Sequence, residues 1–320
     1  MEWWLILIIV LSVLIAFGTF LYLFRLYMRQ GRYKKQNRID HNVVIITGAN
    51  TGIGKETAID LARRGARVYI ACRDIKRGLD ALDDIRRHSR SDFVYFLQLD
   101  LASFDSIRNF VQRFREHEHK LHILINNAGL LAKNSNTKDG FEMTIGVNHL
   151  GHFLLTHLLL DLLIVSAPSR IVNVSSLGHK FAKLEYDDFD SNKKMSVATA
   201  YAKSKLMNIL FTRKLAQKLI AEKVSVNSCH PGCVRTEIAR NFSTYDFLTT
   251  KILGEFLKSP YEGAQTQIRI AVDPELENVT GKYFVDCKPA SVSKEAKNDE
   301  KAEWLYRKSY ELVGLEKIEL

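Results

Sequence analysis

The sequence of 320 residues is poor in cysteine, with only four, and their spacing fits neither a metal motif nor a dense disulfide framework. They are Cys72, Cys229, Cys233 and Cys287. A Pro-Gly pair separates Cys229 from Cys233, so these two thiols do not share a helix face. We therefore expect four reduced thiols in a domain that faces the cytosol, and no metal site.

The sequence also lacks zinc-finger spacing, basic-helix runs and base-stacking motifs, which excludes a nucleic-acid partner despite a formal net charge of +10. No repeat, low-complexity segment or Pro- and Gly-rich linker interrupts the chain after its N-terminal region. Hydrophobic residues make up 46% and charged residues 26%, as in ordinary globular proteins. Length alone allows two smaller domains, but the unbroken pattern favours one domain over residues 41–320.

Residues 3–24 contain no charged side chain. In a helix they reach roughly 33 Å, enough to cross the hydrocarbon core of a bilayer. A cleaved signal peptide, the alternative, needs a positive start, a shorter apolar core and a small-residue cleavage site, and these are missing. Six basic residues follow the apolar run: Arg25, Arg29, Arg32, Lys34, Lys35 and Arg38. We expect a retained anchor over 1–26 and a cytosolic basic linker over 27–40 that can also contact anionic lipid.

Beyond the linker, short apolar runs alternate with stretches of helical periodicity. The runs predict strands at 43–47, 67–72, 93–99, 121–125, 171–174, 224–228 and 282–285. The longer stretches predict helices at 53–64, 140–165 and 201–222. This alternation indicates a parallel sheet with helices on both faces, an α/β architecture. The apolar part of the second helix, 153–165, is too short to span a membrane, so it predicts a buried helix or a subunit interface.

The first predicted strand runs into the glycine-rich sequence TGANTGIG at 47–54, and a helix follows. Gly48 suits a tight turn, Gly52 lets the backbone approach a pyrophosphate, and Gly54 allows the helix to pack closely on the strand. The free N–H groups of the helix start and its positive dipole end attract phosphate. A plain glycine turn is the alternative, but the strand and helix on either side favour a dinucleotide site.

The end of the second strand predicts which dinucleotide binds. An NAD site usually has a carboxylate there, whereas this chain has Cys72 followed by Arg73, and Lys55 comes just after the glycines. A guanidinium can hold a 2′-phosphate in a bidentate manner. We therefore predict NADP(H), with Arg73 as the main determinant. Asp74 is expected to point away or to cap the next helix.

Tyr201 and Lys205 are four residues apart on a predicted helix and so share one face. A nearby ammonium lowers the pKa of a phenol, which suits general acid catalysis of carbonyl reduction or the reverse base catalysis. Lys203 has the wrong spacing and is expected to be solvated. The tyrosine–lysine spacing alone is common, but three other motifs follow predicted strands at the edge where such sheets bind ligands. These are Ser175–Ser176, the NNAG sequence at 126–129 and the Pro231–Gly232 pair.

In combination these motifs resemble the short-chain dehydrogenase/reductase family over residues 41–290. The resemblance implies a single-domain, doubly wound Rossmann sheet of about seven strands. It also implies that Ser176 polarises the substrate carbonyl, Tyr201 is the general acid, and Asn148 anchors a water that relays protons through Lys205. The neighbouring His149 and His152 are expected to be core or interface residues. The residues expected at the cofactor are Gly48, Asn50, Thr51, Gly52, Ile53, Gly54, Arg73, Asp100, Leu101, Asn127, Ala128, Gly129, Tyr201, Lys205, Pro231, Gly232, Val234 and Thr236.

The anchor, together with the sequences ACRD, VNHLGHF, RIVNVSSLGH and AYAKSKLMNILF, resembles the retinol dehydrogenase branch of that family. This resemblance implies NADPH-dependent reduction of all-trans-retinal or a related aldehyde at the endoplasmic reticulum membrane, with the domain facing the cytosol. A lipid droplet or another organelle is an alternative location, and a homodimer is a possible assembly. Reduction of steroid ketones or lipid-peroxidation aldehydes is an alternative activity, and a non-catalytic membrane scaffold an alternative role.

Two segments are expected near the substrate. The insert between Ser176 and Tyr201, around 184–195, could shape the mouth of the pocket. Residues 236–255 carry several aromatic and aliphatic side chains suited to a greasy ligand or a membrane-facing lid, although a packed surface helix is equally compatible. The side chains concerned are Phe242, Tyr245, Phe247, Leu248, Ile252 and, just beyond, Phe256.

Overall fold

The computed structural model describes residues 2–28, 30–133, 135–189, 195–235 and 257–315. An eight-stranded sheet forms the centre of the body, in the order β3-β2-β1-β4-β5-β6-β7-β8. The strands are β1 (Val43–Thr47), β2 (Arg67–Cys72), β3 (Val94–Gln98), β4 (Ile123–Asn126), β5 (Ser169–Val174), β6 (Val224–His230), β7 (Tyr283–Val285) and β8 (Lys288–Pro289). Seven strands are parallel, which confirms the predicted Rossmann fold, and β8 adds a short antiparallel edge that was not predicted.

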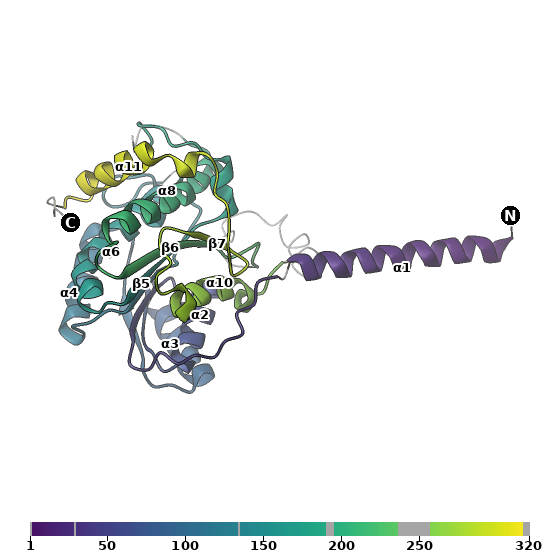
Figure 1. Ribbon diagram of the computed structural model, residues 1–320, viewed down its shortest axis with the longest axis horizontal. Helices are drawn as coiled ribbons and strands as arrows, with labels where there is room; N and C mark the ends of the chain where they lie inside the picture. The colour runs from purple at the N-terminus through teal and green to yellow at the C-terminus, as the bar shows by residue number, and fades with distance from the viewer. Residues whose placement is uncertain (1, 29, 134, 190–194, 236–256, 316–320) are drawn as a thin grey trace.

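Helices cover both faces of the sheet (Figure 1). One layer contains α2 (Gly52–Arg63), α3 (Ile75–Ser89) and α10 (Pro260–Val272). The other contains α4 (Phe104–His117), α6 (His152–Leu158), α7 (Leu160–Val165) and α8 (Val197–Lys218), with α11 (Asp299–Leu312) packed outside α8. Shorter pieces are α5 (Met143–Ile145), η1 (Gly146–Gly151), η2 (Leu177–Phe181), η4 (Pro274–Leu276) and η5 (Glu295–Lys297). Buried side chains fill a separate core on each side of the sheet.

Local sequence signals explain where these elements begin. All five residues of β1 are buried, as expected for a central parallel strand with both faces covered. Ser103 caps α4 by accepting a hydrogen bond from the Ser106 N–H, the role that serine commonly has at the start of a helix. Ser259 and Glu262 form a capping box at the start of α10, where Pro260 takes the first helical position.

The helix predicted over 140–165 is not continuous. Residues 146–151 form a π-helix, η1, and a further break at Leu159 separates α6 from α7. Gly151 lies against Leu101, where an added Cβ would be only 2.6 Å from the Leu101 carbonyl oxygen. The core takes up the apolar residues of α6, including Phe153, Leu154 and Leu155. Of the two alternatives predicted for residues 153–165, a buried helix or a subunit interface, the structure shows the buried helix. The homodimer stays a prediction.

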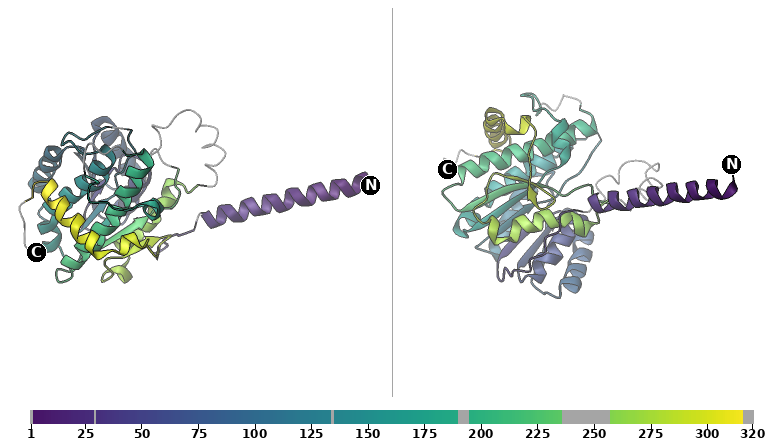
Figure 2. Two further views of the ribbon diagram at one scale, coloured as in Figure 1. Left: turned by 90° about the horizontal axis from the view of Figure 1, so that it is seen from above. Right: turned by 45° about the vertical axis from the view of Figure 1, so that its right-hand side comes forward.

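The N-terminal apolar run forms one helix, α1 (Trp3–Met28), which projects from the body as a straight rod in all views (Figures 1 and 2). Its residues 3–26 are long and apolar enough to cross a membrane, and none of this window is buried against the body. This helix is therefore a candidate membrane anchor.

Candidate active site

A cleft of about 410 Å³ opens at the carboxyl ends of β1, β4, β5 and β6. It brings together most of the predicted motifs. Its lining comprises Gly48, Asn50, Thr51, Gly52, Ile53, Gly54, Asn127, Ala128, Gly129, Val174, Ser175, Ser176, Tyr201, Lys205, His230, Pro231, Gly232, Cys233 and Val234. This is the edge at which open parallel sheets bind their ligands.

The glycine turn between β1 and α2 has the backbone that its sequence predicts. Gly48 and Gly52 adopt φ values of +66° and +57°, in the left-handed region that favours glycine. At Gly54 an added Cβ would lie 2.5 Å from Asn127 Nδ2 and 2.7 Å from the Gly48 carbonyl oxygen. Within the described residues, the Thr51 side chain makes no capping hydrogen bond to α2. The first N–H groups of α2 therefore remain available for an anion, which fits the phosphates of a dinucleotide.

The NNAG segment supports this turn. Asn127 Nδ2 donates to the Thr47 carbonyl oxygen at 2.8 Å, and Gln267 Nε2 in turn donates to Asn127 Oδ1 at 3.4 Å. The backbone N–H groups of Asn127 and Ala128 both donate to Thr47 Oγ1, each at 2.9 Å. Thr47 thus fixes the loop after β4 against the end of β1.

Tyr201 faces Ser176 across the cleft. The Ser176 hydroxyl accepts a hydrogen bond from the Gly178 N–H at 3.1 Å, at the start of η2, and also hydrogen-bonds the Tyr201 side chain. Ser175 points elsewhere, since its buried hydroxyl donates to the Lys205 carbonyl oxygen at 2.7 Å. The structure therefore places Ser176 beside Tyr201 and gives Ser175 a bond within the scaffold.

Lys205 is almost completely buried in the wall of the cleft next to Tyr201. Its ammonium lies 5.5 Å from the centre of the Tyr201 ring and donates to the Val174 carbonyl oxygen at 3.1 Å. Burial lowers the pKa of Lys205 from 10.5 to about 8, because the charged form loses hydration. The amine therefore exchanges its proton near physiological pH.

The pKa of Tyr201 moves in the direction opposite to the one predicted. Burial raises it above the ordinary value of 10.0, and the hydrogen bond with Ser176 offsets this only in part. Lys205 Nζ donates its hydrogen bond to the Val174 carbonyl oxygen and lies over the Tyr201 ring. Tyr201 is consequently a protonated phenol at neutral pH, which is the form that donates a proton.

Asn148 lies fully buried in the π-helix η1, next to Lys205. Its Oδ1 accepts from the Leu130 N–H at 2.9 Å, and its Nδ2 donates to the Leu130 carbonyl oxygen at 3.1 Å. An added Cβ at Gly129 would lie 3.3 Å from Lys205 Nζ and 3.6 Å from Asn148 Oδ1. Gly129 therefore leaves open the space that Lys205 and Asn148 share. Segments of π-helix are frequent at functional sites.

His152 connects Asn148 to Thr47. Its Nε2 lies 2.9 Å from Thr47 Oγ1, and its Nδ1 lies 3.1 Å from the Asn148 carbonyl oxygen. Since Thr47 Oγ1 already accepts two N–H groups, its own proton goes to His152 Nε2, and Nδ1 carries the ring proton. Burial lowers the pKa of His152 to about 4, which keeps it neutral. His152 and His149 are thus buried core residues, as expected.

The surroundings of the second strand bear on the choice of dinucleotide. β2 ends at Cys72, and burial raises the pKa of its thiol to about 11, so this side chain is uncharged at neutral pH. The next residue, Arg73, is exposed, and the end of the strand therefore carries a positive charge and not a negative one. Asp74 caps α3 by accepting from the Arg77 N–H at 2.9 Å, which was one of its two predicted orientations. Lys55 forms an ion pair with Asp84 of α3. A 2′-phosphate at the end of β2 would therefore meet the exposed Arg73, whereas Lys55 is paired with Asp84.

Some predicted residues lie outside the cleft lining. Asp100 Oδ1 accepts from the Ala102 N–H at 3.0 Å after β3, and Leu101 is buried beside Gly151. Thr236 and the aromatic segment 236–256 fall outside the described residues. Sequence reasoning missed His230 and Cys233, which flank Pro231–Gly232 and line the cleft. Their position directly beside that pair, at the end of β6, was the signal available.

Lys203 is not solvated as predicted. It is only 6% exposed and forms ion pairs with Asp188 and Glu185 of the insert after η2. The helix face alone could not reveal this, because both carboxylates come from a separate loop. Lys203 thus ties the part of the insert that the structure describes to α8.

Comparisons with known proteins agree with this geometry. A family model described as short chain dehydrogenase matches residues 42–246, and the chain belongs to the short-chain dehydrogenase/reductase family. It is 47% identical over 313 residues to retinol dehydrogenase 12 of Homo sapiens, covering 96% of this chain and 99% of that protein. It is 50% identical over 274 residues to retinol dehydrogenase 11 of Mus musculus, covering 85% and 86%. Within the family it therefore belongs to the retinol dehydrogenase branch.

A solved structure has the same fold. A putative uncharacterized protein from Mycobacterium paratuberculosis has a TM-score of 0.70 and 32% sequence identity, covering 88% of this chain and 96% of that one. Family membership, together with the glycine turn, supports an oxidoreductase that acts on CH–OH groups with a nicotinamide dinucleotide.

Proposed function

We propose that this protein catalyses the NADPH-dependent reduction of a lipophilic aldehyde or ketone, with all-trans-retinal as the first candidate, and the reverse oxidation of the alcohol. The observation that carries the proposal is the meeting of Ser176, Tyr201 and Lys205 in one cleft beside the glycine turn. The names of the retinol dehydrogenase relatives support the choice of a retinoid.

The chain's own residues would bind the carbonyl and move the proton. The bound dinucleotide supplies the hydride. Ser176 donates a hydrogen bond to the substrate oxygen, and Tyr201 gives that oxygen a proton. Lys205, with a pKa of about 8, replaces the proton on Tyr201, and Asn148 holds the water that reconnects Lys205 to solvent. The raised pKa keeps Tyr201 protonated at neutral pH, the form that donates in reduction, and its phenolate would be the base for the reverse oxidation.

The cofactor is proposed to be NADPH because Arg73 is an exposed cation after β2. Arg73→Asp should lower the ratio of kcat/KM with NADPH to that with NADH by about 10- to 100-fold, the value of one charge-assisted hydrogen-bonded pair. Lys76→Asp removes a nearby exposed cation from α3 and is the matched control, with no change expected. An unchanged ratio in Arg73→Asp would contradict the NADPH assignment.

The membrane anchor suits a substrate that dissolves in bilayers. We place α1 in the endoplasmic reticulum membrane with the catalytic body in the cytosol, because basic residues follow the apolar helix. A lipid droplet or another organelle membrane is the alternative. Protease protection in microsomes tests this orientation: digestion of the body in intact vesicles supports it, and protection of the body contradicts it.

Substrate class is tested by steady-state NADPH consumption with the full chain in lipid nanodiscs. All-trans-retinal, decanal and steroid ketones are compared by kcat/KM. A preference for retinal supports the proposal, and a preference for one of the others selects the alternative activity. If no carbonyl is turned over, the non-catalytic scaffold becomes the better account.

A further inference from the structure

The basic linker between α1 and β1 lies on the catalytic body from Gln30 onward. The Tyr33 N–H donates to Gln265 Oε1 of α10 at 3.2 Å, and the Tyr33 ring is buried. The Arg64 guanidinium donates to the carbonyl oxygens of Lys35 and Asn37, each at 3.0 Å. These contacts fix the linker to α10 and to the end of α2, so the chain leaves the body at a defined point.

That point lies beside the rim of the cleft. Lys258, which is 2% exposed, donates from Nζ to the Gln30 carbonyl oxygen at 2.6 Å and forms an ion pair with Asp286. The same side chain packs on Gly232, where an added Cβ would be 2.7 Å from Lys258 Cδ. Because Gly232 lines the cleft, one buried lysine joins the start of the linker to the cofactor-side wall.

The short distance along the chain limits how far this rim can be from the bilayer. The candidate span ends at Leu26, four residues before Gln30. Four residues reach at most ~14 Å, and the headgroup layer is roughly 5–8 Å thick on each side. The rim at Gly232 therefore lies at the membrane surface when α1 spans the bilayer.

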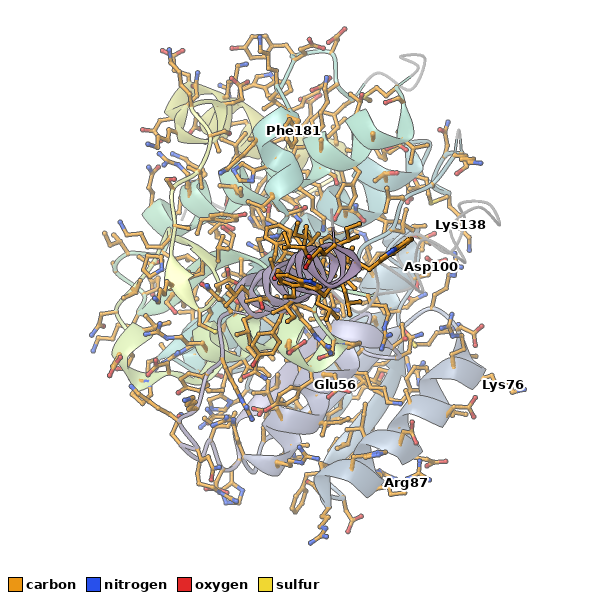
Figure 3. The ribbon with its side chains drawn as sticks, turned by 90° about the vertical axis from the view of Figure 1, so that its right-hand side faces the viewer. Glu56, Lys76, Arg87, Asp100, Lys138 and Phe181 are labelled. Carbon is orange, nitrogen blue, oxygen red and sulfur yellow. The ribbon has the colours of Figure 1, made fainter. Side chains whose placement is uncertain are left out.

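A second apolar feature lies near this rim. η2 follows Ser176 directly and carries Phe181, whose side chain is 88% exposed, and the partly exposed Leu177. Figure 3 looks at the body from the side on which α1 projects and shows Phe181 above the helix. The exposed Lys180 and Lys183 stand on either side of Phe181 in the sequence. An exposed aromatic between lysines suits an anionic membrane interface.

We propose that η2 is a second membrane contact, in which Phe181 enters the interface of the bilayer that α1 spans while Lys180 and Lys183 meet anionic headgroups. The docked linker and η2 together hold the cleft mouth against the lipid. A bilayer-dissolved ligand then passes into the cleft without crossing water. This inference rests on α1 spanning the membrane and is independent of the proposed reaction.

Fluorescence quenching by brominated lipid tests the contact without any activity. The full chain carrying Trp3→Phe and Trp4→Phe is reconstituted in vesicles of phosphatidylcholine and phosphatidylserine, with Trp304 as a constant background. Phe181→Trp is added to this chain, and Phe93→Trp is the matched control. Phe93 is 55% exposed just before β3, at the opposite end of the parallel strands from the cleft.

We expect brominated acyl chains to quench the tryptophan introduced at 181 and to leave the one at 93 unchanged. Equal quenching at the two positions, or none at 181, would overturn the inference. A blue-shifted but unquenched signal at 181 would show that another copy of the chain covers η2, which also overturns it.

A second measurement tests whether the membrane contact of η2 affects the entry of substrate into the cleft. Phe181→Ser should raise KM for a bilayer-dissolved aldehyde and leave KM for a short water-soluble aldehyde unchanged, while Phe93→Ser changes neither. Equal KM values for Phe181→Ser and the parent chain would contradict a role in substrate entry. If the parent and both serine variants turn over no aldehyde, the proposed function is contradicted. The membrane contact is still tested in that case, because lipid quenching does not depend on activity.

Discussion

Replacing His152 by leucine removes a bridge between the cofactor turn and the π-helix while keeping a similar side-chain volume. In the native chain His152 Nδ1 donates to the Asn148 carbonyl oxygen, and Nε2 accepts from the Thr47 hydroxyl. In the variant the Asn148 carbonyl loses this donor. The Thr47 proton has only the Ile125 carbonyl oxygen left, at 3.4 Å.

The cost follows from those two groups. A buried polar group left without its partner costs about 1–3 kcal/mol, and the Thr47 hydroxyl recovers part of its loss at Ile125, so we expect about 2–4 kcal/mol in total. Because the pKa of His152 is about 4, the native ring stays neutral, whereas the unfolded histidine titrates near its ordinary value of 6.5. The parent therefore loses about 0.8 kcal/mol between pH 8 and pH 6 that the leucine variant does not lose, and the difference in stability shrinks by that amount. Asn148 should also shift, which lowers kcat more than it raises KM.

Urea unfolding in detergent micelles and steady-state kinetics measure the two effects. His152→Asn can keep a donor at the position of Nδ1, and His152→Gln can keep a polar atom at the position of Nε2. We expect His152→Asn to retain more of kcat than His152→Gln, and both to be more stable than His152→Leu. A leucine variant with the parent's urea midpoint and kcat would refute the bridge.

Two further predictions concern stability. Burial lowers the pKa values of four histidines to between about 3 and 4. Below pH 6.5 the unfolded chain therefore binds more protons than the folded chain. The free energy of unfolding should decrease by about 5 kcal/mol for each pH unit that the pH is lowered near pH 5. The four histidines are His149, His152, His157 and His230. A urea midpoint that is the same at pH 7 and pH 5 would contradict this. Asp188→Asn removes one carboxylate from the buried Lys203 ammonium and, among the described residues, leaves it paired with Glu185. This variant should cost about 3 kcal/mol, and Asp188→Leu combined with Lys203→Met should recover most of that loss. A double variant no more stable than Asp188→Asn would argue against a buried ion pair.

Features set by neighbouring residues could be predicted from the sequence. The apolar run of β1, the glycines at 48, 52 and 54 and the capping role of Ser103 each depend on a few adjacent positions. The cleft followed from the same patterns, because the carboxyl ends of parallel strands must meet at one edge of the sheet.

Features set by distant contacts could not be predicted. The close approach of Gly151 to Leu101 joins residues fifty positions apart, and the burial of Lys203 depends on a carboxylate fifteen positions earlier in a loop. Lys55, which comes just after the glycines, pairs with Asp84 of a second helix. The direction of the Tyr201 pKa was predicted wrongly, because spacing on a helix says nothing of how deeply the phenol is buried.

We propose that Tyr201 donates the proton in carbonyl reduction. The most direct test of this proposal is the rate of NADPH oxidation with all-trans-retinal by Tyr201→Phe in nanodiscs. Tyr283→Phe is the matched control, since the buried Tyr283 hydroxyl has no hydrogen-bond partner among the described residues. We expect a loss in kcat of about 100-fold or more for Tyr201→Phe, with KM nearly unchanged and the control at the parent's rate. A Tyr201→Phe enzyme that turns over as fast as the parent chain would contradict the proposal.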